Sequence, residues 1–196
     1  MQAKTTQKVF DTRRLTVNAM FAAIATLLMY VEFPLPFLPP FLKIDLSGVV
    51  VLLAAFLFGP VPAVLITLVK NLVHLMSSSS GGVGQLADFI ILSSFVVTAA
   101  LIYRRKKDKK HALIGCCAAI VVITIVGALA NKYLLIPFYS QLMPIDVIIS
   151  LCAKVNPIIV DLNSYYIFGA APFNFIKGVI LSVITILCYK KLFPWH

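Results

Sequence analysis

Two polar side chains stand one helical turn apart in the apolar stretch "APFNFIKGV", residues 171–179: Asn174 and Lys177. In a helix, three residues separate them by about 4.5 Å along the axis and place them on similar faces. A carboxamide both donates and accepts hydrogen bonds, and an ammonium group donates, so the pair could hold neighbouring heteroatoms of one ligand. Asn131 is a similar amide near the end of an earlier apolar segment. The alternative is a lysine that reaches toward the membrane surface beside two amides that bond neighbouring helices.

Motifs for catalysis are missing from the sequence. No stretch matches G-x-x-x-x-G-K-[ST], so the chain carries no P-loop for ATP. No G-x-S-x-G elbow occurs, and His74, His111 and His196 lie too far apart for the H-E-x-x-H zinc spacing. We interpret the four cysteines as small packing residues. We therefore expect no enzyme and no metal site, and a ligand-binding protein is the leading class.

The composition places these residues in a membrane. Of the 196 residues, 61% are hydrophobic and 12% are charged, and the mean hydropathy is +0.99, well outside the range of soluble domains. Six apolar segments are candidates to cross about 30 Å of hydrocarbon. They are Leu15–Val31, Ile44–Phe58, Ala63–Met76, Leu86–Tyr103, Ala112–Ile136 and Pro172–Leu192. We predict an all-α membrane protein with six transmembrane helices in a single domain, with a tail over residues 1–13 and a bundle over residues 14–192.

Three of these segments have alternative interpretations. Residues 59–62 read Gly-Pro-Val-Pro and should separate the second helix from the third, because neither proline can donate a helical hydrogen bond. One long kinked helix over residues 44–76 is the less favoured alternative. The first segment follows several basic residues, as in a signal peptide, but its 17 apolar residues end without a small-x-small cleavage site. We therefore expect it to remain as the first helix.

Lysine and arginine are unevenly distributed along the chain. Four precede the first segment, six lie in "RRKKDKK" after the fourth, and two lie near the C-terminus. If six helices alternate in direction, all of these fall on one side of the membrane, and the positive-inside rule makes that side cytoplasmic. The prediction is that both termini are cytoplasmic, with the basic loop also able to touch anionic lipid.

Three connections are then predicted on the outer side, over residues 32–43, 77–85 and 137–171. The first belongs to "EFPLPFLPPFLKID", whose four prolines favour a stiff, extended segment that could form a lid; a connector on the bilayer surface is the alternative. The second, "SSSSGGVGQ", is small and flexible, so it suits either close approach of a ligand or a plain turn. The third is too long for a simple linker, and residues 145–154 are expected to form a short surface helix.

Polar residues within the apolar segments gather toward the predicted outer half. Such residues are costly in a membrane unless they have a partner or a function. The group consists of Asp45, Lys70, Asn71, His74, Asp88, Asn131, Lys132, Asn174 and Lys177. We predict a polar pocket that opens outward and has apolar walls. For Lys70 the favoured interpretation is an ion pair with Asp45 or Asp88 that locks the bundle.

Four stretches carry a specific resemblance: "EFPLPFLPPFLKID", "FLFGPVPAVLITLVKNLVHL", "GGVGQLADF" and "APFNFIKGVILSVITILCYKKL". With them, the chain resembles the riboflavin-specific S components of energy-coupling factor (ECF) vitamin transporters, from about Arg14 to Leu192. The resemblance implies a multi-pass protein of the bacterial plasma membrane that binds riboflavin as transported substrate and needs no cofactor. It also implies a transmembrane coupling subunit and two cytoplasmic ATPase subunits as partners, and no nucleic acid.

The resemblance also implies roles for individual residues. The family's two asparagines and one lysine at the polar edge of the isoalloxazine ring match Asn131, Asn174 and Lys177. Their donors and acceptors suit the alternating N–H and C=O groups of a uracil-like edge. Phe41 and Leu42 would cover the ring, in keeping with a lid.

Three further features of the chain bear on the resemblance. Gly84 would approach the ribityl hydroxyls. Gln85 and Asp88 depart from the family pattern and are left outside the predicted site. Ala19 and Ala23 in "NAMFAAIA" match the small residues that let the coupling subunit pack closely, although such residues also suit packing inside the bundle.

Two other function classes remain open at this point. One is an S component for another vitamin, such as pantothenate or biotin. The other is an independent secondary transporter or channel, which would favour two matching halves with broken helices; the sequence contains no such repeat.

Overall fold

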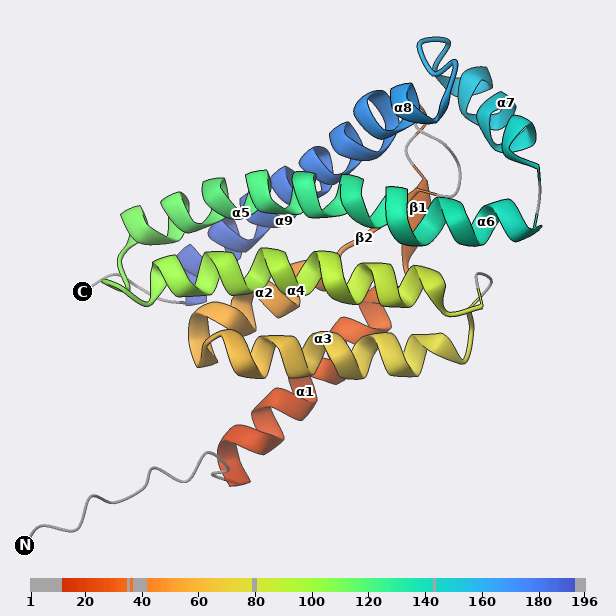
Figure 1. Cartoon of the computed structure of the whole chain (residues 1–196). Helices are drawn as coiled ribbons and strands as arrows, with labels where there is room; N and C mark the ends of the chain where they lie inside the picture. The colour runs from red at the N-terminus through yellow and green to blue at the C-terminus, as the bar shows by residue number, and fades with distance from the viewer. Residues whose placement is uncertain (1–11, 35, 37–41, 79–80, 143, 193–196) are drawn as a thin grey trace, which may run out of the picture.

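The computed structural model describes residues 12–34, 36, 42–78, 81–142 and 144–192, and this part of the chain is nearly all helical (Figure 1). Its elements in chain order are α1 (Thr12–Met29), β1 (Glu32–Pro34), β2 (Lys43–Asp45), α2 (Ser47–Phe58), α3 (Pro60–Leu75), α4 (Val83–Tyr103), α5 (Lys109–Ala130), η1 (Asn131–Leu135), α6 (Ile136–Leu142), α7 (Ile145–Val155), α8 (Leu162–Tyr165), η2 (Tyr166–Ala170) and α9 (Ala171–Leu192). The elements η1 and η2 are short π-helices.

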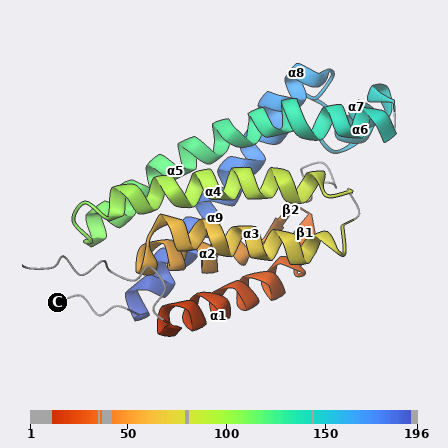
Figure 2. The same ribbon diagram turned by 60° about the horizontal axis from the view of Figure 1, so that its bottom comes forward.

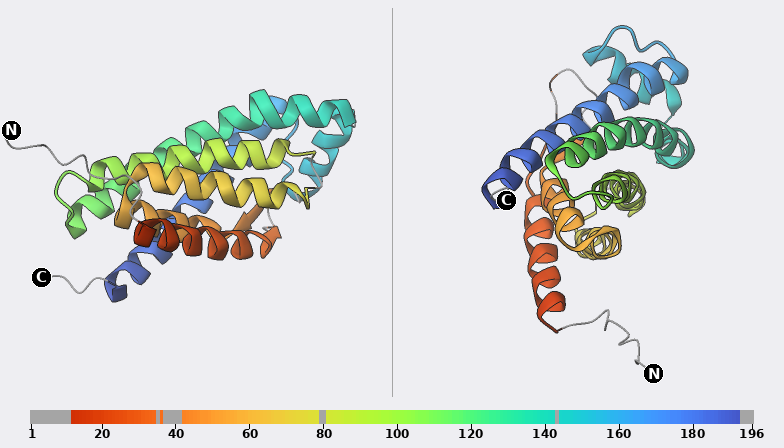
Figure 3. Two further views of the ribbon diagram at one scale, coloured as in Figure 1. Left: turned by 90° about the horizontal axis from the view of Figure 1, so that it is seen from below. Right: turned by 90° about the vertical axis from the view of Figure 1, so that its left-hand side faces the viewer.

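The long helices form one bundle with distinct ends. Helices α1, α3, α4 and α5 follow one another side by side, and α9 crosses behind them against α5 and α2 (Figures 2 and 3). The α2–α3 turn, the α4–α5 turn and the end of α9 lie at one end of the bundle. The β-hairpin, the α3–α4 connection and α7 lie toward the other end. The basic α4–α5 turn is therefore far from the hairpin.

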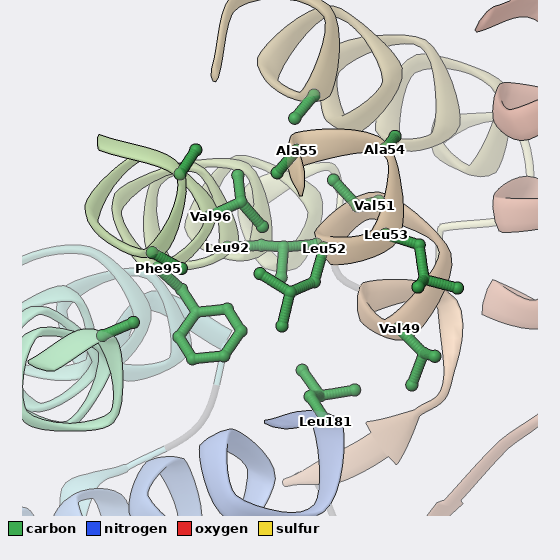
Figure 4. Packing of buried hydrophobic residues seen from close by; sticks show 14 of the residues in the cluster. Val49, Val51, Leu52, Leu53, Ala54, Ala55, Leu92, Phe95, Val96 and Leu181 are labelled. Atoms are coloured by element: carbon green, nitrogen blue, oxygen red, sulfur yellow. The ribbon is translucent and has the colours of Figure 1, made fainter. Parts of the chain in front are cut away.

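The apolar core lies where α2, α4 and α9 meet. Leu52 of α2 and Leu92 of α4 lie next to each other, and Leu181 of α9 points toward them (Figure 4). Gly48 allows α2 to approach this closely, because a Cβ added there would lie 2.6 Å from Leu181 Cδ1. Many outward-facing side chains of the bundle are large and apolar, as expected for helices that lipid surrounds.

The predicted break after the second segment is confirmed. Helix α2 ends at Phe58, and Gly59 has a φ of 98°, which glycine adopts without steric cost. Pro60 then begins α3, where its missing N–H removes no helical hydrogen bond. The alternative of one kinked helix is wrong.

Within the described part of the chain, three helical stretches are long and apolar enough to cross a membrane: residues 83–103, 109–141 and 162–189. Helices α2 and α3 are shorter apolar helices. The second stretch runs from α5 through η1 into α6, and the third runs from α8 through η2 into α9. Much of the connection predicted over residues 137–171 is therefore helix, and only α7 within it matches the expected surface helix.

The prolines explain why the predicted boundaries were too short. Pro137 and Pro172 marked the ends of helices in the sequence, yet each is the second residue of an α-helix that directly follows a π-helix. In these π-turns the backbone N–H of Ile136 bonds to Asn131 O, and that of Ala171 bonds to Tyr166 O. The wider π-turn changes the normal hydrogen-bond pattern just before the proline, so the helix continues with a local irregularity.

The two ends of the proline-rich segment pair with each other as a β-hairpin. Strands β1 and β2 pair antiparallel, with Glu32 opposite Asp45 and Pro34 opposite Lys43. Residues 35 and 37–41 of this segment, including the predicted ring-covering Phe41, lie outside the described residues. The described ends agree with the prediction of extended rather than helical backbone.

Two aspartates cap helices outside the long spans. Asp108 Oδ1 accepts a hydrogen bond from the backbone N–H of His111, 2.8 Å away, and this bond lowers the pKa of the Asp108 carboxyl. Asp161 forms a capping box with Ser164 at the start of α8, and these hydrogen bonds lower the pKa of Asp161. Such caps satisfy backbone groups that would otherwise lack partners at a helix start.

Candidate ligand-binding site

A cavity of about 360 Å³ opens at the hairpin end of the bundle, within the range of about 300–1,000 Å³ typical of small-molecule sites. The ends of α1 and α3, the start of α4, the hairpin, η1, α6 and the start of α9 all contribute to it. Its lining consists of Met29, Tyr30, Glu32, Leu42, Lys43, Asp45, His74, Ser77, Gly84, Gln85, Ala87, Asp88, Ile91, Asn131, Leu135, Tyr139, Phe173, Asn174 and Lys177. Five of the six predicted ligand-binding residues are in this lining, and the sixth, Phe41, is not described.

Of the two predicted asparagines, one lies in the first π-helix and the other lies shortly after the second. Asn131 is the first residue of η1, and Asn174 lies four residues after the end of η2. The Asn131 amide donates to Gly127 O at 2.9 Å, and its Oδ1 accepts from the Tyr165 hydroxyl at 2.7 Å. Both ends of this carboxamide are thereby fixed before a ligand binds. Irregular π-turns often occur where a helix supplies functional side chains.

Asn174 is fixed by a close contact between helices. Its amide donates to Ala170 O at 2.8 Å, and its side chain lies directly against Gly127 of α5. A Cβ on Gly127 would lie only 2.2 Å from Asn174 Cγ. The Asn174 Oδ1 accepts no hydrogen bond from the described residues, so it can accept one from a ligand in the cavity.

Lys177 enters the cavity wall between two carboxylates. Its Nζ lies 3.0 Å from Asp88 Oδ1 and 3.4 Å from Asp45 Oδ2, and only 6% of the residue is exposed. Asp45 is held in turn by Ser47, whose backbone N–H donates to Asp45 Oδ1 at 2.9 Å. The ammonium group is therefore paired, as a buried charge must be.

Lys70 lies behind this wall, fully buried. Its Nζ donates to Asp88 Oδ2 at 2.7 Å and to Ser47 Oγ at 2.8 Å. The predicted ion pair between Lys70 and Asp88 is confirmed, and Asp45 joins the same cluster through Ser47. Asn71 also donates to Asp88 Oδ2, at 3.1 Å.

The opposite rim of the cavity carries neutral polar groups. Gln85 Nε2 lies 3.0 Å from His74 Nδ1, and Gln85 Oε1 accepts from Ser78 Oγ at 2.8 Å. The His74 ring packs on Tyr30, with ring centroids 4.8 Å apart. Gly84 precedes Gln85 in the first turn of α4 and lines this rim. The rim can offer hydrogen bonds to hydroxyl groups of a ligand.

Apolar side chains form part of the cavity wall. Leu42 is 5% exposed and packs in a cluster with Ile44, Ile136 and Phe173. Met29, Ile91 and Leu135 line the cavity from other helices. Within the described residues, no group of three His, Cys, Asp or Glu side chains could hold a metal ion. The site therefore suits a ligand with an apolar body and a hydrogen-bonding edge.

Sequence reasoning missed several members of this site. Asp88 and Gln85 were left out because they depart from the family pattern, yet both line the cavity beside predicted residues. The position of Asp88 within an apolar helix was a usable signal, because a buried carboxylate needs a cation. Tyr165 gave no such signal, since a tyrosine in an aromatic stretch is ordinary. Tyr165 meets Asn131 only because the helix extends from Pro172 toward the N-terminus, through η2 to α8.

The small residues Ala19 and Ala23 lie on the outside of α1. Both are exposed, whereas Ala22 and Ala25 face inward and are buried. Ala19 and Ala23 line a groove between α1 and α3, together with Val61, Leu65 and Val69 among other residues. The alternative that these two alanines pack inside the bundle is therefore wrong.

Comparison with known proteins adds independent findings. Residues 13–189 match the family described as "ECF transporter, substrate-specific component". The chain is 36% identical over 180 residues to the riboflavin transporter RibU of Staphylococcus aureus (strain TCH60), covering 92% of this chain and 90% of the relative. It is 30% identical over 188 residues to the riboflavin transporter FmnP of Bacillus subtilis (strain 168), covering 93% of each.

A solved structure agrees with these matches. It is described as "Structure and mechanism of the S component of a bacterial ECF transporter", and it superposes with a TM-score of 0.74 at 36% identity, covering 92% of this chain and 95% of that one. The family is one of membrane transporter components, which confirms the expectation that the chain is not an enzyme. The chain belongs to the substrate-specific components of ECF transporters.

Proposed function

We propose that this chain captures riboflavin from outside the cell for an ECF transporter. One observation carries the proposal: Asn131, Asn174 and Lys177 meet in a single cavity that also has apolar wall segments from α1, α4 and η1. The isoalloxazine ring has an apolar dimethylbenzene side and a uracil-like edge, so it needs such a division. The relatives that share the chain's length and family are named riboflavin transporters.

Each polar group has a defined role in the proposed complex. Asn174 Oδ1 accepts from a ring N–H, and the Lys177 ammonium donates to a ring carbonyl or nitrogen. Asn131 completes the ring edge, held in place by Tyr165. Leu42 covers the ring with Phe41, and the rim at Gly84 meets the ribityl chain. Riboflavin is the transported substrate and acts as no cofactor.

The membrane arrangement forms a second part of the proposal. All six apolar helices cross the plasma membrane of a bacterium, and both termini are cytoplasmic. The exposed basic α4–α5 turn, residues 104–110, supports this orientation because it lies at the opposite end of the bundle from the cavity. The cavity then opens outward, where the vitamin is found.

The groove between α1 and α3 is proposed as the contact for the transmembrane coupling subunit. Ala19 and Ala23 have no bulky side chain, so a partner helix can approach the α1 backbone closely. Two cytoplasmic ATPase subunits would complete the transporter. The sequence contains no P-loop, so the energy for transport must come from such partners.

Titration of the purified chain with riboflavin, followed by quenching of flavin fluorescence, tests the binding site. We expect Asn174→Ala and Lys177→Ala each to weaken binding by about 5- to 150-fold, because loss of a partner to a buried polar group costs about 1–3 kcal/mol. Lys132→Ala serves as a control, since Lys132 is exposed and does not line the cavity. Unchanged titration curves for both site variants would refute the assignment.

The same titration and an uptake assay separate the remaining function classes. An S component for another vitamin would fail to quench flavin fluorescence but would bind that vitamin. An independent transporter would accumulate substrate in proteoliposomes that contain this chain alone. We expect binding of riboflavin without accumulation, and sustained uphill uptake by the isolated chain would contradict the proposal.

A further inference from the structure

Four charged groups, three of them on buried residues and one on the partly buried Asp88, form one neutral cluster next to the cavity. They are the ammonium groups of Lys70 and Lys177 and the carboxylates of Asp45 and Asp88. Three of these residues line the cavity, whereas Lys70 lies behind them and has 0% exposure. Two positive and two negative charges cancel, so the cluster avoids the high cost of an unbalanced charge in a membrane.

Asp88 connects the two lysines. Its Oδ2 accepts from Lys70 at 2.7 Å, and its Oδ1 accepts from Lys177 at 3.0 Å. Lys70 thus lies at one end of a chain of charges and Lys177 lies at the end that reaches the cavity. Asp88 is the direct link between the two lysines, and Lys70 also reaches Asp45 through Ser47.

The hydrogen bonds of Lys177 leave it a donor for a ligand. An ammonium group has three N–H donors. Among the described residues, Asp88 Oδ1 and Asp45 Oδ2 accept two of them. The third can point to a ligand only while the two carboxylates hold the ammonium group at its present place.

We propose that Lys70 is a positioning residue for ligand binding: by neutralising Asp88, it leaves Lys177 with a donor for the ligand. Without Lys70, two carboxylates share one ammonium group, and Lys177 is drawn toward them as their sole cation. A net negative charge would also remain beside the electron-rich carbonyl edge of the ligand. This inference rests on the proposed riboflavin function, because the ligand used to test it is riboflavin.

Charge compensation tests the proposal. We expect Lys70→Met to weaken riboflavin binding by about 10- to 100-fold, the range for loss of a buried charge-assisted contact. Asp88→Asn alone leaves one positive charge in excess and should also weaken binding. The double variant Lys70→Met with Asp88→Asn restores neutrality, with Lys177 paired to Asp45. It should bind more tightly than either single variant.

A merely structural role for Lys70 predicts a different result. If the two substitutions only loosened the bundle, their losses would multiply and the double variant would bind most weakly. That outcome, or an unchanged affinity of Lys70→Met, would overturn the inference. Lys132→Met removes the same charge from an exposed position in the same half of the bundle, and it should leave the titration curve unchanged.

The wild-type titration separates this inference from the proposed function. If the wild-type chain does not bind riboflavin, the proposed function is wrong. If it binds and the double variant shows no recovery, only the role of Lys70 is wrong. Should Lys70→Met fail to fold, the comparison of Asp88→Asn with the double variant still decides, because neutrality predicts tighter binding by the double variant.

Discussion

Gly127 offers a way to disturb the proposed binding site without changing a proposed ligand-binding residue. It lies in α5 against the Asn174 side chain of α9. A Cβ at this position would lie 2.2 Å from Asn174 Cγ, 2.3 Å from Nδ2 and 2.5 Å from Oδ1. Ordinary van der Waals contact begins near 3.4 Å, so in Gly127→Ala the new Cβ and the carboxamide must move apart by about 1.2 Å.

A displacement of this size is decisive for a hydrogen bond. Donor and acceptor atoms lie about 2.7–3.2 Å apart in good bonds, and a separation near 3.6 Å no longer counts as one. The displacement should therefore weaken or break both the hydrogen bond from Asn174 to Ala170 O and the proposed hydrogen bond to riboflavin. Loss of about 1–3 kcal/mol corresponds to about 5- to 150-fold weaker binding, so Gly127→Ala should approach the effect of Asn174→Ala.

Gly115→Ala is the matched control for this prediction. It places the same extra methyl group on the same helix, where its Cβ would lie 2.8 Å from Ala99 O. The two glycines are separated by about 18 Å along the helix axis. Fluorescence titration should show a loss of affinity for Gly127→Ala and, in folded protein, none for Gly115→Ala. Equal affinities of Gly127→Ala and wild type, or equal losses for both variants, would refute the reasoning.

Three further predictions concern Tyr165, the groove between α1 and α3, and residues 32–43. Tyr165→Phe removes the hydroxyl donor to Asn131 Oδ1 and should weaken riboflavin binding by about 2- to 12-fold, since one hydrogen bond contributes about 0.5–1.5 kcal/mol; a titration curve equal to wild type would contradict this. Ala23→Trp should leave the affinity intact but reduce transport by the assembled transporter, measured as riboflavin uptake into proteoliposomes; unimpaired uptake would remove the α1–α3 groove as the coupling contact. Bound riboflavin should slow hydrogen exchange in residues 32–43 if this segment is a lid, and equal exchange with and without ligand would leave it as a connector.

The polar cluster was predictable from one sequence because membranes make polar residues expensive. Lys70 inside an apolar helix required a carboxylate partner, and the sequence offered few. The structure confirms Asp88 as that partner. The separation of α2 from α3 was equally accessible, because Gly59 and Pro60 act through local backbone geometry alone. Both predictions rest on properties that do not depend on how helices are arranged in space.

The contacts between helices could not be predicted from the sequence. Nothing in the periodicity of α5 and α9 shows that Gly127 meets Asn174, because that contact depends on the relative shift and rotation of two helices. The shared role of Asp88 has the same origin. It binds Lys70 of α3 and Lys177 of α9 at once, and only the packed bundle brings these three helices together at one level.

The two prolines show how a correct local rule led to a wrong boundary that matters for the site. Had the helix ended before Pro137, Asn131 would lie within two turns of its end, and helix ends fray and fix side chains poorly. Had α9 begun at Pro172, Tyr165 would lie in a loop with no reason to meet Asn131. Instead, a π-helix precedes each proline and the helix continues through it. Tyr165, the last residue of α8, donates to Asn131 Oδ1 at 2.7 Å. The irregular turns are therefore what allow two separate helices to fix the carboxamide of Asn131, a proposed ligand-binding residue.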